Sequence, residues 1–152
     1  MGDPLEPPQA LLELYKTAVE MADRVSARRG VSNSFFLTVQ TAFISVVALG
    51  GPRLASVWWA SLVVTLAGAA LSAAWWLQLK SYRDLNTAKF MVINKLEERL
   101  PVRIFSDEWA NLKPDPAPSW LKRYAELGLS ERQVPIVFAV LHLLLFLGRL
   151  FI

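Results

Sequence analysis

The sequence holds few side chains whose types and spacing could support a chemical reaction. It has one histidine, His142, and no cysteine, and it lacks a glycine-rich phosphate loop, an HExxH motif and a GxSxG motif. Acidic residues occur in adjacent pairs at Glu97/Glu98 and Asp107/Glu108. Adjacent side chains on a helix point about 100° apart and do not converge on one substrate atom, so we interpret these pairs as solvated helix surface. The sequence therefore predicts a non-enzymatic protein without a metal or cofactor site.

Two polar side chains, Gln40 and His142, instead fall inside long apolar stretches. Such groups are costly to place in lipid, so both are expected to face protein or water. For Gln40 we expect a hydrogen bond to another helix. For His142 a structural role with satisfied nitrogens is favoured, and a role as a gate or proton sensor is the alternative because an imidazole changes charge near physiological pH.

The apolar stretches that contain these groups are nearly long enough to cross a bilayer. Hydrophobic residues make up 54% of the 152 residues, and the mean hydropathy is +0.35. Three blocks without acidic residues run over 35–49, 54–79 and 134–152, close to the roughly 20 residues that a membrane-spanning helix needs. The sequence predicts an all-α membrane protein with three transmembrane helices, and a soluble bundle with one buried helix is the alternative.

Two tryptophan pairs, Trp58/Trp59 and Trp75/Trp76, bracket the middle apolar block. At a rise of about 1.5 Å per residue, a helix between the pairs is roughly 24 to 27 Å long, which is close to the hydrocarbon thickness of a bilayer. An indole combines a large apolar body with one N–H donor and is most stable where headgroup water meets the acyl chains. The four tryptophans are therefore predicted to be anchors at the two membrane surfaces.

Basic residues indicate which side of the membrane each segment occupies. Four precede the first span, one lies in the turn after it, and ten lie in residues 80–133. The positive-inside rule then places the N-terminus and residues 80–133 in the cytoplasm. The same segment carries eight acidic residues, which argues against nucleic-acid binding. Arg28 and Arg29, at the membrane edge, are expected to meet anionic lipid.

The pattern divides the chain into four segments. These are a cytoplasmic amphipathic helix in 1–33, a transmembrane hairpin in 34–79, a cytoplasmic helical segment with a Pro-rich linker in 80–133, and a third transmembrane helix in 134–152. No helix breaker follows the second span, so it is predicted to continue into the cytoplasm as one long helix until Pro101. Ser106 is expected to cap a short helix, and Ser130 with Gln133 to form a capping box before the third span.

Two further groups of residues are expected at helix contacts. Asn86 and Lys89 lie within the apolar arc of the long helix and are costly to bury unless paired, although Lys89 could instead extend its charge to the edge and Asn86 could make a routine interhelical bond. Small residues share one face of the second span, which predicts close packing within or between subunits. This face comprises Ser61, Thr65, Gly68, Ala69 and Ser72.

Three segments carry a resemblance to a known family. They are LYKTAVEMADRVSARRGVSNSFF, then SYRDLNTAKFMVINKLEERLPV followed by Glu108 and Trp109, and ERQVPIVF. Together they resemble the RipA family of small octameric bacterial membrane proteins, which is distinct from the peptidoglycan hydrolase of the same name. The resemblance implies an inner-membrane protein with cytoplasmic helices, eight copies in the assembly and no catalytic signature.

Two classes of function are compatible with these features. The first is a non-enzymatic homo-oligomeric scaffold in the inner membrane. Its transmembrane helices would assemble the subunits into a ring, and its cytoplasmic helices would present a surface to partners. The second is a channel or transporter that conducts along the axis of the ring. A pore is lined by polar groups, and the spans offer only small hydroxyls, Gln40 and His142, so the scaffold is favoured.

Overall fold

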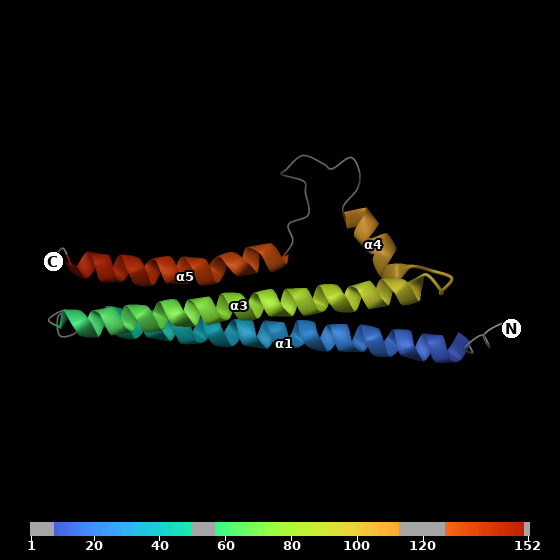
Figure 1. Ribbon diagram of the computed structural model, residues 1–152, viewed down its shortest axis with the longest axis horizontal. Helices are drawn as coiled ribbons and strands as arrows, with labels where there is room; N and C mark the ends of the chain where they lie inside the picture. Colours follow the sequence, from blue (N-terminus) through green and yellow to red (C-terminus); the bar gives the residue numbers. More distant parts are fainter. Residues whose placement is uncertain (1–7, 50–56, 113–126, 151–152) are drawn as a thin grey trace. The chain divides into compact units, whose positions relative to one another are not determined.

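The computed structural model describes residues 8–49, 57–112 and 127–150, and all regular structure within them is helical. The helices are α1 (Pro8–Leu49), α3 (Trp58–Glu97), α4 (Ile104–Leu112) and α5 (Leu127–Leu150), as Figure 1 shows. Three stretches are long and apolar enough to cross a membrane: Gln9–Leu49, Trp58–Glu97 and Ser130–Gly148. The predicted all-α membrane fold is confirmed. The predicted Pro-rich linker and the turn between the first two spans lie outside the described residues.

The two long helices are continuous. The first runs for 42 residues, so the boundary drawn at residue 33 does not coincide with a helix end. The second runs for 40 residues, from the second span into the polar segment, which confirms the predicted long helix. It ends four residues before Pro101 in a tight turn, in which the amide of Leu100 donates to the carbonyl of Glu97 at 3.0 Å.

Contacts divide the chain into two compact units, which are described separately. Unit 1 comprises residues 1–28 and 82–125. Its core forms where α1, α3 and α4 meet: Tyr15, Ala22 and Ile93 are buried, and Phe90 and Phe105 meet edge to face with ring centroids 5.3 Å apart. Aromatic pairs in this geometry add about 0.5–1.5 kcal/mol to the burial of their surface. The short helix α4 is therefore held to the long helices by aromatic packing.

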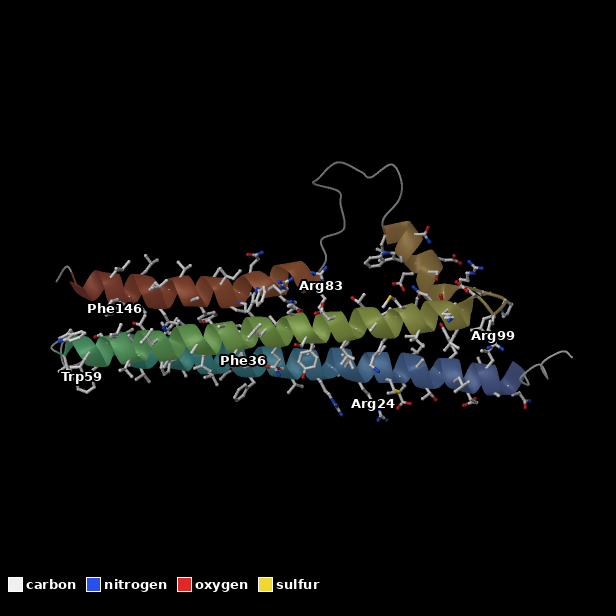
Figure 2. All side chains as sticks on the ribbon, viewed as in Figure 1. Arg24, Phe36, Trp59, Arg83, Arg99 and Phe146 are labelled. Atoms are coloured by element: carbon white, nitrogen blue, oxygen red, sulfur yellow. The ribbon has the colours of Figure 1, made fainter. Side chains whose placement is uncertain are left out.

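Unit 2 comprises residues 29–81 and 126–152, and it brings together α1, α3 and α5. Trp75, at the centre of this unit, is 1% exposed. The indole stacks on Phe36 with the ring centroids 5.8 Å apart and the planes 6° apart, and it meets Phe138 of α5 at 5.9 Å. Figure 2 shows Trp59 on α3 and Phe146 on α5 near the same end of this unit.

Two predicted helix starts are wrong. The helix α4 begins two residues before Ser106, and α5 begins three residues before Ser130, so neither serine is an N-cap. In α4 another side chain supplies the cap, as described below. In α5 the residues that follow Ser130 contact the other helices: Glu131 reaches Arg29 of α1, and Arg132 lies over Trp76 of α3.

Candidate functional site

A network of polar groups joins the three helices of unit 2. Gln40 on α1 is completely buried. Its side-chain amide donates to the hydroxyl of Ser72 at 2.7 Å and to the carbonyl of Gly68 at 3.2 Å, both on α3. Its amide oxygen lies 2.8 Å from Nε2 of His142 on α5, which is 2% exposed. Because that oxygen can only accept, Nε2 of His142 donates. The network therefore satisfies both hydrogens of the Gln40 amide and its oxygen without water.

The close approach of α5 to α3 depends on Gly68. A Cβ atom built at this position would overlap three atoms of the His142 imidazole, so the ring occupies the space that any larger residue would fill. The imidazole also meets the ring of Phe43 edge to face, with the ring centroids 5.7 Å apart. This arrangement fixes His142 between an aromatic ring and a bare helix backbone.

The small-residue face of the second span packs inside the subunit. Ser61, Thr65 and Ser72 are 4%, 8% and 2% exposed, Gly68 is buried, and Ala69 is half-buried. The hydroxyls of Thr65 and Ser72 donate to backbone carbonyls one turn earlier, at 2.9 and 3.0 Å. Of the two possibilities that the sequence left open for this face, the structure shows packing within the subunit.

The four predicted tryptophan anchors occupy three different environments. Trp58 and Trp59 are 68% and 59% exposed at the start of α3. Trp75 is buried, and its indole N–H donates to the side-chain oxygen of Asn33 at 2.9 Å, so it does not need headgroup water. Trp76 is half-buried, and the guanidinium of Arg132 lies 4.7 Å from the centre of its ring. The structure thus gives Trp75 a packing role that the sequence pattern did not reveal.

The second polar centre is a buried carboxylate in unit 1. Glu97, the last residue of α3, is completely buried. One oxygen accepts from the hydroxyl of Tyr15 at 3.0 Å and from the amide of Phe105 at 2.9 Å. The other accepts from the amide and the hydroxyl of Ser106, at 3.1 and 3.0 Å. Glu97 therefore caps the N-terminus of α4 from another helix and ties it to α1.

The hydrogen bonds around Glu97 determine its charge state. Burial raises the pKa of this carboxyl group, but the bonds from Phe105, Ser106 and Tyr15 outweigh burial and leave the pKa below its ordinary value. Burial, the hydrogen bond to Glu97 and the negative charge of Glu97 raise the pKa of Tyr15 to about 12. The pair is a carboxylate and a neutral phenol over the physiological range. The interpretation of Glu97 as solvated surface is wrong, whereas the adjacent Glu98 is exposed.

The expected partners of Asn86 and Lys89 are not found among the residues that the structure describes. Both side chains are half-buried. The side-chain oxygen of Asn86 is buried without a hydrogen-bond partner, and no ion pair of Lys89 occurs among the described residues. Asn86 lines a groove of about 570 Å³ between α3 and α4, together with Met91, Glu108 and Trp109. Pairing of these two side chains therefore stays a prediction for the assembled protein.

Glu97 is the main polar group that sequence reasoning missed. Its cap on α4 joins residues eight and nine positions apart across a turn, and its bond to Tyr15 spans 82 positions. A local pattern does not encode such a bond. One signal was available: an acidic residue just before a turn and a short helix can face the N–H groups at the start of that helix.

Comparison with known proteins gives one match. The family model for the Octameric membrane protein family (8xMP) matches residues 12–151. No curated protein and no solved structure matches the chain. The family description agrees with the resemblance to small octameric membrane proteins, and it does not include the name RipA. Since the family model covers nearly the whole chain, this protein belongs to the octameric membrane protein family.

Proposed function

We propose that this oligomeric membrane protein is a non-enzymatic scaffold of the bacterial inner membrane, a homo-octamer with its N-terminus and residues 80–133 in the cytoplasm. The observation that carries the proposal is the bonding of Gln40, Ser72 and His142 to one another within one subunit. A conducting path needs polar groups directed toward ions or water. In unit 2 the amide of Gln40 and the imidazole of His142, the polar groups singled out within the spans, are instead used for helix packing.

The surface of unit 1 supports the scaffold proposal. Large apolar side chains are exposed on α1, α3 and α4, among them Leu14, Met21 and Met91 at 52%, 51% and 63%. The groove beside Trp109 adds a concave surface with both apolar and amide groups. Exposed apolar surface of this kind is typical of protein contact sites. We propose that neighbouring subunits and a cytoplasmic partner cover it.

A channel is the second candidate, because one observation favours it. Thr38, Thr41 and Ser45 lie at helical spacing on α1 and are exposed. The hydroxyls of Thr38 and Ser45 donate within the helix to the carbonyls of Ser34 and Thr41, with oxygen–oxygen distances of 2.9 and 2.8 Å. The two hydroxyl oxygens can still accept hydrogen bonds. Eight copies of such a face around an axis would form a weakly polar lining.

Reconstitution into liposomes separates the two candidates. Vesicles loaded with a potassium-sensitive, a chloride-sensitive or a pH-sensitive dye are compared with empty vesicles, and density maps of the assembly are examined along its axis. The scaffold proposal expects no flux above the empty vesicles and an axis closed by side chains or lipid. Flux of the wild type above the empty vesicles, together with an open path along the axis, would establish the channel instead.

Cysteine labelling tests the proposed orientation, since the chain has no native cysteine. Ser119→Cys and Pro52→Cys, which lie outside the described residues, report on the segment 80–133 and on the turn between the first two spans. In intact cells an impermeant maleimide should label Pro52→Cys and leave Ser119→Cys unlabelled until the cells are opened. Labelling of Ser119→Cys alone would reverse the orientation. The protein should also stay with the membrane after high-salt and alkaline washing.

A further inference from the structure

One end of unit 2 gathers charged and aromatic side chains from all three of its helices. Arg132 of α5 lies over the ring of Trp76 of α3, with 4.7 Å between the guanidinium carbon and the ring centre. The neighbouring Glu131 reaches Arg29 of α1, with 3.6 Å between Oε2 and Nε. The two contacts involve consecutive residues of α5, so the side chains lie at the same level along the bundle.

The charges at this level are unbalanced. The basic side chains described in unit 2 are Arg29, Lys80 and Arg132, and Glu131 is the acid described there. Lys80 is exposed one turn after Trp76. The side chains of Arg29 and Glu131 are 24% and 29% exposed, and their pair neutralises Glu131. A net positive charge therefore remains at the end of the bundle where the apolar part of the helices gives way to polar sequence.

The guanidinium of Arg132 is held in place, and the described residues offer it no acceptor. No hydrogen bond or ion pair to it occurs among the described residues, and its Nε–H is buried without a partner. A buried charged donor without an acceptor is costly. The contact with Trp76 holds the guanidinium against the ring, and this planar group offers its two Nη groups as a fork of donors. A phosphate group fits such a fork, because arginine binds two phosphate oxygens at once.

We propose that Arg132, which lies over Trp76 beside the pair of Arg29 and Glu131, forms a binding site for the phosphate group of an anionic phospholipid. The ring of Trp76 belongs at the level of the headgroups, and basic groups between membrane helices recognise anionic headgroups. The proposal rests on the chain spanning a membrane and not on the scaffold function or on the orientation, since both leaflets carry phosphate.

Lipid binding to the delipidated, full-length protein in mild detergent tests the site. Native mass spectrometry measures the affinity for phosphatidylglycerol and for phosphatidylcholine in the wild type and in Arg132→Gln. The variant should lose roughly ten- to a hundredfold in affinity for phosphatidylglycerol, as expected for charge-assisted bonds. Lys80→Gln is the matched control for surface charge, and its loss should not exceed about fivefold. Phosphatidylcholine should bind more weakly than phosphatidylglycerol to the wild type.

Further measurements test whether the variants fold and whether the bound phosphate belongs to a lipid or is free in solution. Arg132→Lys keeps the charge but loses the planar fork, so its affinity should fall between those of the wild type and Arg132→Gln, with unchanged helical circular dichroism. Bound lipid should persist in excess inorganic phosphate. Equal losses in Arg132→Gln and Lys80→Gln, or equal binding of the two lipids, would overturn the site. If inorganic phosphate displaced the lipid and chloride at the same ionic strength did not, the ligand of the site would be free phosphate and not the lipid.

Discussion

At the scale of single residues, two buried polar side chains each join three helices through hydrogen bonds at several atoms. Gln40 connects α1, α3 and α5 through two hydrogens and one oxygen. Glu97 connects α1, α3 and α4 through both carboxylate oxygens. Hydrogen bonds with an ionised partner are roughly twice as strong as neutral ones. Glu97 is therefore expected to contribute more to the stability of its unit than Gln40 does.

Replacing Glu97 by Gln should loosen α4. The amide cannot accept on both atoms, so at least one of the donors from Phe105, Ser106 and Tyr15 loses its partner, at a cost of about 1.5–3 kcal/mol for bonds to a charged group. Hydrogen exchange at the amides of Phe105 and Ser106 should become faster. The control is Glu98→Gln, at an exposed neighbouring position. It should change the free energy of unfolding by no more than about 0.5 kcal/mol. Equal effects of the two variants would contradict the capping role.

The stability of unit 1 should depend on pH at both extremes. The pKa of Glu97 is lower in the folded state than its ordinary value of 4.5, so its contribution is present above 4.5 and is lost as the pH falls through the folded value. The pKa of Tyr15 is raised from 10.0 to about 12, so its contribution is complete below 10.0 and is lost toward 12. Hydrogen exchange at the amides of α4, measured as a function of pH, checks both losses of stability. Glu97→Gln should abolish the loss at low pH.

At the scale of elements, the structure depends on how closely the helices approach one another. In unit 2 the bare backbone at Gly68 admits the ring of His142, while Trp75 fills the space between α1, α3 and α5. In lipid there is no hydrophobic drive between helices, so contact distance and interhelical hydrogen bonds determine association. The three-helix packing of unit 2 is thus sensitive to added volume at a few positions.

Gly68→Ala should destabilise unit 2 by about 1–3 kcal/mol, the usual cost of overpacking. Gly30→Ala is the matched control, because a Cβ atom added at Gly30 would meet no neighbouring side chain or helix within 4 Å and alanine favours a helix interior by up to about 1 kcal/mol. Unfolding in mixed detergent micelles measures both. In the background of His142→Ala the Gly68→Ala change should cost less, since the ring is gone. An unchanged cost there would show that the clash is not with His142.

Sequence reasoning found the three spans and the long α3, and it missed the continuity of α1 and most of the contacts between helices. The three spans and the continuation of α3 follow from hydropathy and from the distance to the next helix breaker, which act along the chain. The start of α4 depends on Glu97, which belongs to another helix and precedes α4 by a turn. The same limit explains Trp75: its type predicts a preference for an interface, but Asn33 and two phenylalanines supply its surroundings.

At the scale of the whole molecule, the family match implies octameric self-assembly, and the subunit shows which surfaces are already used. The small-residue face of α3 is occupied within unit 2, so Gly68→Leu is expected to disturb the subunit itself rather than only its contacts with neighbours. Exposed apolar side chains on both units remain, together with the unpaired oxygen of Asn86. A cyclic assembly buries two different faces of each subunit.

The face of α1 formed by Thr38, Thr41, Ala42 and Ser45 is exposed in the subunit, and its small side chains allow close contact with a neighbouring helix in lipid. Thr41→Leu should therefore disrupt the octamer while leaving membrane insertion and subunit stability intact, because the change adds apolar bulk at an exposed position. Val46→Leu, at an exposed position on α1 about 140° around the helix from Thr41, is the matched control and should assemble normally. Native mass spectrometry in mild detergent should show eight chains for the wild type and the control, and smaller species for Thr41→Leu. An intact octamer in Thr41→Leu would assign the contact to another face, and a wild-type monomer at micromolar concentration would contradict the ring.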